Sequence, residues 1–475
     1  WVLFMNEIWN RTSLVFLVLS ISSFLFSNSF FSGMTGVNLN YSGSTETNED
    51  NIETYNPDLK LQAFFAGQFN FSDKLWARTE FSINTADFLD ENIFNNGTST
   101  NFRIEEISLV IKGELLSATN YFSTFIGTYE QIGSDIFLQK YFGIEPIASK
   151  LTTSYLGLSG SNIHKQSGFG IGDVLLLKNT PMAFGFYSYI NSDSLNKDNS
   201  NIFVFNADLR FATSLQYFTL DILGGIGIPL ENTTDDYLIA VQTAYWHAGT
   251  NILIGNNYTQ SVFLQLGIFN AAFNKTEFNL LKETLYFLLE PRFNFKNCNL
   301  DITLYNIPNK NYNDSSNLPF LDGSLGGNIN LYVDSVKLGS SFFTLGLNTN
   351  ISYSNADILS CLGENGTEYT QETFTEQNFN ISLAAYASTQ FLSGELSCII
   401  KMNFMELSRN NPGKVFEEVC LHQDSEGNLF VAEGNHRVFA YQALKAVREF
   451  VTGQEQKGIS FDAILYPVTI RGMDV

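Results

Sequence analysis

The sequence has few charged residues, and most of those it has are acidic. Asp, Glu, Lys and Arg make up 16% of the 475 residues, whereas an ordinary soluble protein contains roughly 25%. The 26 basic residues against 48 acidic ones leave a formal net charge of −22. Because binding to nucleic-acid phosphates needs clusters of positive charge, this balance argues against a nucleic-acid-binding protein.

Cysteine and long apolar runs are scarce as well. The chain has four cysteines and no C-x-x-C pair, which argues against a disulfide-stabilised scaffold. No segment beyond the N-terminal region approaches the roughly 18 consecutive apolar residues that indicate a membrane-spanning helix. Aromatic residues, in contrast, reach 15% and hydrophobic residues 44%. Disorder is therefore excluded, and the charge-poor, aromatic-rich composition favours β-structure.

The N-terminal region has the pattern of an export signal. Arg11 precedes an apolar stretch at residues 14–26 that only serines interrupt, and small polar residues follow at 27–29. A positive start, a short apolar run and a small-residue exit are typical of a secretory signal peptide. We therefore predict a signal peptide over residues 1–29, in which the residues before Met5 lie upstream of the natural start. The alternative is a buried N-terminal helix.

Beyond this region, apolar and polar residues alternate with a period of two. Between residues 60 and 71 the odd positions are apolar and the even positions mostly polar. The triplet Ser72-Asp73-Lys74 interrupts the alternation, which resumes at residues 75–83. Such alternation on both sides of a tight turn predicts a hairpin of two long, half-apolar strands. The same pattern recurs at residues 203–211, 262–268, 292–305, 328–334 and 345–353.

Strands of about 9–11 residues with one apolar and one polar face are what a transmembrane β-barrel requires. The apolar face meets lipid, the polar face meets water, and closure of the sheet pairs every backbone group. Tight turns alternate with long polar stretches, as in outer-membrane barrels. These stretches are residues 42–56, 87–101, 191–201, 306–317 and 355–377. The alternative is a soluble sandwich or secreted β-solenoid, although their strands usually have only about 5–6 residues.

One segment carries a resemblance to a known class of protein. Residues 396–404 alternate and end on Phe404, and they resemble the final strand of bacterial outer-membrane barrels, which the barrel-assembly machinery recognises by its terminal Phe. Residues 30–404 as a whole resemble a porin-type outer-membrane barrel. The resemblance implies an all-β fold, a closed antiparallel transmembrane barrel. At roughly 22 residues per strand and connection, this length provides about 14–18 strands, even in number.

The resemblance implies a passive channel and no enzymatic activity. A barrel of this size encloses an aqueous lumen, and we expect it to let small hydrophilic solutes diffuse through the lipid bilayer of the outer membrane, as a homotrimer in the porin manner. An even strand number places both termini in the periplasm. The alternative is a surface-exposed binding or adhesion barrel with a closed lumen. The candidate lumen-facing residues are Arg78, Glu80, Arg103, Asp208, Arg210, Arg292, Lys296 and Asp301.

The last part of the chain, residues 405–475, loses the aromatic alternation and is expected to be a small α+β segment. A predicted strand at 429–433 leads through a Gly-Asn turn into a predicted helix at 436–451. This segment resembles the ParB/sulfiredoxin-like fold, in which a Gly-x-x-Arg turn at a helix N-terminus holds nucleotide phosphates. Free N–H groups and the helix dipole favour an anion there. The resemblance implies the phosphate-binding candidates Gly434, Asn435, His436 and Arg437.

The C-terminal resemblance has departures that bear on function. Asn435 stands where sulfiredoxins have their nucleophilic cysteine, and the DNA-binding helices that follow the module in partition proteins are absent. An ordinary capped helix is the alternative interpretation. Because a periplasmic segment would meet little nucleotide, we interpret residues 405–475 as a fusion or a stray reading frame.

The sequence predicts no catalytic residue, cofactor or metal site. His164 and His247 are far from each other and from the cysteines along the chain, so no metal-ligand spacing is recognised. The glycine-rich residues 168–172 lack the context of a dinucleotide-binding loop, and we interpret them as part of a strand.

Overall fold

The computed structural model describes most of the predicted barrel region and three short segments of the C-terminal part. The described residues are 30–47, 53–89, 100–153, 163–164, 166–193, 202–233, 236–239, 244–256, 259–272, 284–296, 298–308, 318–339, 341–354, 356–358, 378–391, 394–405, 420–423, 429–433 and 465–467. The predicted signal peptide at residues 1–29 therefore lies outside the described residues.

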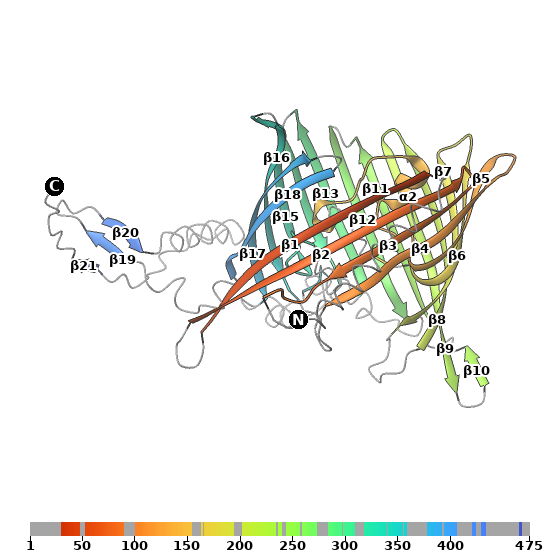
Figure 1. The fold of residues 1–475 in the computed structure, drawn as a ribbon, viewed down its shortest axis with the longest axis horizontal. Coiled ribbons are helices and arrows are strands. Elements are labelled where there is room, and N and C mark those ends of the chain that lie inside the picture. Colours follow the sequence, from red (N-terminus) through yellow and green to blue (C-terminus); the bar gives the residue numbers. More distant parts are fainter. Residues whose placement is uncertain are drawn as a thin grey trace, which may run out of the picture.

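A single antiparallel sheet dominates the described chain (Figure 1). Its strands are β1 (Phe30–Thr47), β2 (Glu53–Ser72), β3 (Leu75–Asn84), β4 (Asn101–Glu114), β5 (Ala118–Thr128), β6 (Ser167–Leu177), β7 (Met182–Asp193), β8 (Ile202–Leu215), β9 (Phe218–Thr233), β10 (Asp236–Ile239), β11 (Tyr245–Gly255), β12 (Gln260–Ala272), β13 (Leu285–Phe295), β14 (Cys298–Asn306), β15 (Leu325–Leu338), β16 (Ser341–Tyr353), β17 (Phe379–Phe391) and β18 (Gly394–Asn403). The predicted all-β fold is thus confirmed.

Each strand pairs with its neighbour in the sequence, with one local exception. The C-terminal part of β9 pairs with the short β10, and the rest of β9 pairs with β11. Strands β10 and β11 therefore share one position, and the described sheet is seventeen strands wide. Figure 1 shows the strands tilted and the sheet curled, with β1 to β5 facing the green strands across the interior.

The connections differ between the two ends of the sheet. At one end, strands are joined by tight turns, such as the one between Ser72 and Leu75 or between Leu215 and Phe218. At the other end lie the long connections, including the one between β5 and β6. The expected separation of short turns from long loops is confirmed. The predicted loop at 42–56 is shorter than expected, because β1 continues to Thr47 and β2 begins at Glu53.

Two features of the predicted barrel are wrong. The strand number is odd, so β1 and β18 both run from the tight-turn end to the long-connection end. No ladder of hydrogen bonds joins β1 to β18 within the described residues, so the sheet is not closed by backbone pairing. One additional or missing strand decides whether the strand number is even or odd. An average length per strand therefore cannot predict it. The even number, on which the placement of both termini in the periplasm rested, is not found.

The two faces of the curled sheet have opposite polarity. In β8, the side chains of Asp208 and Arg210 are 0% and 2% exposed, while Leu209 between them is 66% exposed. Large apolar side chains on other strands, such as Phe186 and Ile329, are likewise exposed. A soluble protein shows the reverse arrangement, whereas a membrane barrel places its apolar face outward. The period-two interpretation of the sequence is confirmed.

Several predicted elements agree in detail with the structure. The hairpin around Ser72-Asp73-Lys74 is formed by β2 and β3, and the proposed final strand is β18. The glycine-rich residues 168–172 belong to β6. No helix within the described part of the chain has the length and hydropathy needed to cross a membrane.

The C-terminal segments form a small separate sheet. Strand β19 (Cys420–Gln423) pairs antiparallel with β20 (Leu429–Glu433) and parallel with β21 (Leu465–Pro467). The predicted strand at 429–433 is confirmed, and the predicted helix at 436–451 lies outside the described residues.

The polarity of the two faces can be tested at one position of each. Leu209→Arg places a charge on the apolar outer face in the middle of β8, so we expect it to reduce the free energy of unfolding from a bilayer by roughly 2–4 kcal/mol. Gln68 lies on the polar inner face of β2, so Gln68→Arg should change the free energy of unfolding by about 0.5 kcal/mol or less. Urea titration of vesicle-embedded protein measures both. Equal losses would contradict the assignment of the faces.

Candidate functional site

The long connection between β5 and β6 folds onto the inner face of the sheet. We call its described residues, 129–153, 163–164 and 166, the insert. It contains α2 (Ile136–Phe142) and the 3-10 turn η1 (Lys150–Thr152). Gly143 ends α2 with φ 62°, a left-handed conformation that glycine adopts readily. The side chain of Ser149 accepts a hydrogen bond from the N–H of Leu151 and thereby caps η1.

Polar contacts attach the insert to widely separated strands. Arg292 of β13 donates to the carbonyl of Ile147 at 2.7 Å. Further along, Lys150 donates to the hydroxyl of Tyr386 in β17 at 3.2 Å, and its ammonium lies 3.4 Å from the ring centroid of Tyr332 in β15. Since the insert leaves the sheet at β5 and rejoins it at β6, its contacts with β13, β15 and β17 show that it crosses the interior and narrows it.

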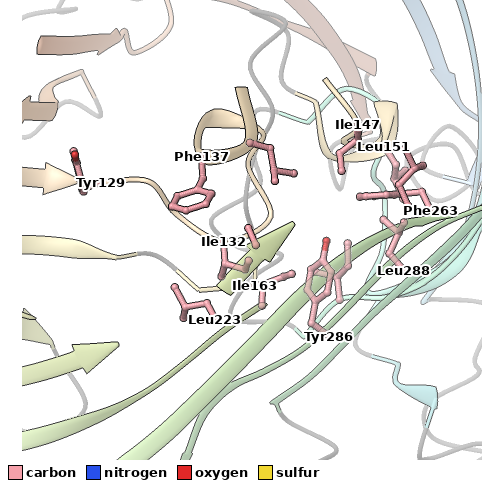
Figure 2. Packing of buried hydrophobic residues seen from close by; sticks show 14 of the residues in the cluster. Tyr129, Ile132, Phe137, Ile147, Leu151, Ile163, Leu223, Phe263, Tyr286 and Leu288 are labelled. Atoms are coloured by element: carbon pink, nitrogen blue, oxygen red, sulfur yellow. The ribbon is translucent and has the colours of Figure 1, made fainter. Parts of the chain in front are cut away.

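Apolar packing reinforces these contacts (Figure 2). Phe137 and Leu138 of α2 are fully buried, and they belong to one apolar cluster with inward-facing wall residues, among them Phe263 and Leu288. Ile163 packs so closely on β11 and β12 that a Cβ at Gly249 or Gly267 would collide with it. Wall glycines thus make room for the insert. The sequence did not reveal the insert, because its aromatic and aliphatic residues do not mark it as a polar loop.

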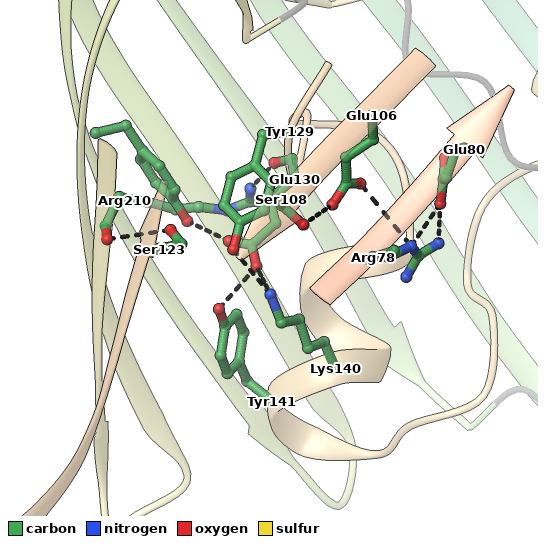
Figure 3. Close-up of polar contacts among 12 residues, drawn as sticks. Arg78, Glu80, Glu106, Ser108, Ser123, Tyr129, Glu130, Lys140, Tyr141 and Arg210 are labelled. Carbon is green, nitrogen blue, oxygen red and sulfur yellow. Dashed lines mark hydrogen bonds and ion pairs between the residues drawn. The ribbon is translucent and has the colours of Figure 1, made fainter. Parts of the chain in front are cut away.

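A buried carboxylate lies at the start of the insert (Figure 3). Glu130 is 2% exposed, and it accepts hydrogen bonds from the hydroxyls of Tyr141 and Tyr187, each at 2.7 Å. The ammonium of Lys140 pairs with the same carboxylate and also donates to Tyr129 at 3.0 Å. Three donors and one full positive charge therefore compensate the burial of this carboxylate.

The pKa values of this pair follow from their mutual contact. Burial alone would raise the pKa of Glu130, but the Lys140 ammonium and the tyrosine hydrogen bonds outweigh burial and lower it below its usual range. Burial likewise opposes the charge of Lys140, but Glu130 and Tyr129 outweigh it and raise the Lys140 pKa above its usual range. Both groups are therefore charged across the neutral range.

A cavity of about 840 Å³ lies between the insert and the inner wall of β2 to β5. The wall contributes polar residues such as Gln68 and Ser108, and the insert contributes Gln139 and Lys140. Its charged lining is mixed, with basic Arg78, Lys112 and Lys140 against acidic Asp73, Glu106 and Glu130. The cavity reaches the tight-turn end of the sheet, since residues of the β2–β3 turn line it. Such a polar, water-accessible space can hold or pass a hydrophilic solute.

The predicted lumen-facing residues have diverse environments. Arg78 lines the cavity and pairs with Glu80, which is buried. Arg103 is exposed and lies 4.0 Å from Glu105. Lys296 lies in the turn after β13, beyond the strand itself.

Of the other four candidates, Asp208, Arg210 and Asp301 are buried and Arg292 is half-buried. Arg210 forms a bidentate pair with Asp221, with N···O distances of 2.8 and 2.6 Å, and also donates to the backbone carbonyl of Glu130. Arg292 bonds Glu290 at 2.7 Å, and Asp301 accepts from Asn330 at 3.2 Å. Arg210 and Arg292 join the wall to the insert, whereas Asp301 joins two neighbouring strands. The sequence alone could not show which partners these charges have.

Two histidines that are distant in the sequence lie together in the structure. The rings of His164 in the insert and His247 in β11 stack with centroids 3.5 Å apart. Both are buried, and both lie beside Asp208 of β8. Burial and the neighbouring His247 lower the pKa of His164 well below its usual value, so its imidazole is neutral. The phosphate-binding candidates of the C-terminal part, residues 434–437, lie outside the described residues.

Comparisons with known proteins give distant structural neighbours only. No family model and no curated protein matches the sequence. Among solved structures, one mutant of Rhodopseudomonas blastica porin is 9% identical and covers 69% of this chain and 96% of its own, with a TM-score of 0.36. Another mutant of this porin is 8% identical and covers 79% of this chain and 100% of its own, with a TM-score of 0.34. TM-scores this low do not establish a shared fold, so the fold described above rests on the strand ladders.

The attachment of the insert can be tested at Lys140. Lys140→Met leaves the buried Glu130 carboxylate without its cation, so we expect the opening free energy of α2 to fall by about 1.5–3 kcal/mol, the range for hydrogen bonds to charged groups. Hydrogen exchange of the α2 amides measures this change. Lys112→Met is the matched control, because Lys112 also lines the cavity but belongs to β4. If both variants accelerate α2 exchange equally, the role assigned to Lys140 is wrong.

The same pair predicts a dependence on pH. The pKa of Glu130 is lower in the folded protein than its unfolded value of about 4.3. Its contribution to stability is therefore complete above roughly pH 4.3 and is lost as the pH falls through the folded pKa. We expect protection of α2, corrected for the intrinsic pH dependence of exchange, to decrease below about pH 4. In Glu130→Gln this decrease should be absent. If the protection of α2 still decreases in this variant, another group causes the decrease.

Proposed function

We propose that residues 30–404 form an outer-membrane β-barrel channel through which small hydrophilic solutes diffuse. The observation that carries the proposal is the polar cavity of about 840 Å³ inside a sheet whose outer face is apolar. An apolar exterior suits lipid, and a polar interior suits water. The proposal is non-enzymatic, and it does not include residues 405–475.

The proposed path runs between the insert and the wall formed by β2 to β5. At the tight-turn end it begins among Asn70 and Asp73, and it continues past Arg78 and Glu106. Ser82 and Glu105, hydrogen-bonded to each other, lie on the next inward positions toward the long connections. The opposite side of the interior is occupied by the insert. The open path is therefore narrower than the interior that the curled sheet encloses.

The mixed charge of the lining limits the selectivity that the path can have. Basic and acidic residues of the cavity are equal in number among its described lining residues. We therefore expect weak discrimination between small cations and anions. Neutral and zwitterionic solutes are the preferred class under this proposal.

A second candidate is a binding or adhesion barrel with a closed lumen. The dense packing of the insert against β12, β13 and β14 favours it, because this packing fills part of the interior. Under this proposal the long connections would act at the surface. A homotrimer, assembly by the barrel-assembly machinery and location in the outer membrane belong to both proposals.

Conductance in planar bilayers separates the two. We expect the full chain to show stepwise conductance, because the cavity provides a polar path. Gln139→Trp should reduce the single-channel conductance, since Gln139 is exposed to the cavity and a larger side chain narrows it. Gln216→Trp, in the exposed turn between β8 and β9, is the control and should leave the conductance unchanged. Folded protein that gives a silent bilayer would rule out the channel and favour the closed barrel.

A further inference from the structure

A cluster of three side chains that commonly bind metals lies apart from the cavity lining. His164 comes from the insert, Asp208 from β8 and His247 from β11, and one candidate ligand atom of each lies within 4.8 Å of the other two. Their exposed fractions are 4%, 0% and 1%. None of the three lines the cavity of the proposed channel, so their arrangement needs a separate explanation.

The distances fit a small metal ion. Nε2 of His247 lies 2.8 Å from one oxygen of Asp208, and Nε2 of His164 lies 3.9 Å from the other. A tetrahedral zinc ion with ligand distances near 2.0–2.1 Å holds neighbouring ligand atoms about 3.3 Å apart. The two observed distances lie on either side of this value. Nε2 of His164 now bonds the Tyr189 hydroxyl at 2.8 Å, and its ring stacks on that of His247 with centroids 3.5 Å apart. Coordination through both imidazoles therefore requires the His164 ring to turn out of this stack.

The charge of Asp208 is not balanced by a permanent cation. Among the described residues, its ion-pair partners are the two histidines, which carry charge only when protonated. Its remaining hydrogen bonds come from neutral groups, Tyr189 at 3.1 Å and Gln166 at 3.2 Å. A fully buried carboxylate without a compensating charge is costly. A bound divalent cation would supply that charge.

Unpaired atoms surround the same point. Nδ1 of His164, Nδ1 of His247 and Oε1 of Gln166 are buried and have no hydrogen-bond partner within the described chain. Buried polar atoms without partners are uncommon, because leaving them unpaired destabilises the fold. An imidazole binds a metal through either ring nitrogen, and an amide oxygen is a further donor. Three such atoms in one cluster mark a polar site whose partners are incomplete.

We propose that His164, His247 and Asp208 bind one Zn²⁺ ion. Two imidazoles and one carboxylate are a donor set that zinc prefers, whereas Ca²⁺ and Mg²⁺ require mainly oxygen ligands. The fourth position would be taken by Oε1 of Gln166, by the Tyr189 hydroxyl or by water. The ion would join the insert to β8 and β11, at a point distant in sequence from Glu130 and Lys140. Because the cluster is buried, the metal would enter during folding.

The test measures zinc directly and is independent of conductance. The full chain is refolded in detergent with equimolar ZnCl₂, desalted, and analysed for metal by mass spectrometry, with faster unheated gel migration as the check of folding. We expect about one zinc per folded chain and background levels in His164→Gln and His247→Gln. His422→Gln is the matched control, because His422 lies in β19, and it should retain zinc.

Cobalt provides a second readout of the same site. Refolding with CoCl₂ should give the strong visible absorption of tetrahedral Co²⁺ in the wild-type chain and in His422→Gln. Folded wild-type protein without retained zinc would overturn the proposal, and so would equal retention in all variants. If the glutamine variants fail to fold, the wild-type cobalt spectrum decides, and weak octahedral absorption would reject the site.

Discussion

The apolar exterior of the sheet is the constraint on which the rest of the structure depends. Because strand side chains alternate between faces, an apolar outer face requires the other half of the side chains to point inward. On these strands that half is rich in Asn, Asp, Glu and Arg. Buried polar groups need partners, and a curled wall brings few of them across a wide interior. Neighbouring strands supply some of these partners, such as Asp221 for Arg210, and the insert supplies others.

The contacts of the insert show how this requirement is met. Arg210 and Arg292 of the wall each donate to a backbone carbonyl of the insert. In the other direction, the insert's Ser149 donates to the carboxylate of Glu290 in β13. Backbone carbonyls of the insert thus accept hydrogen bonds from charged wall side chains. Without these donors the carbonyls would be buried and unpaired. The same contacts leave the β2 to β5 side of the interior open, which is where the cavity lies.

The sequence predicted those features that depend on local periodicity. Alternation identified the faces of β2, β3 and β16, and the triplet at 72–74 identified a turn, because each of these signals lies within a few neighbouring residues. Strand parity failed, since one additional or missing strand changes it without altering the average pattern. The partners of Asp208 and of Glu130 were also beyond prediction. They come from segments far away in the sequence, and only the curvature of the sheet brings them together.

The pairing pattern of the sheet has a consequence for how the chain folds. Every ladder in the described barrel region joins strands that are consecutive along the chain or separated only by β10, so the sheet can grow by successive hairpins with low contact order. Among the described residues, the hydrogen bonds that span the longest stretches of chain belong to the insert, such as Ser149 with Glu290 and Lys150 with Tyr386. Each of these contacts closes a long loop, and we expect the entropy cost of that closure to arise late in folding. Docking of the insert is therefore the step at which the stability of the strands before β6 first depends on the strands from β13 onward.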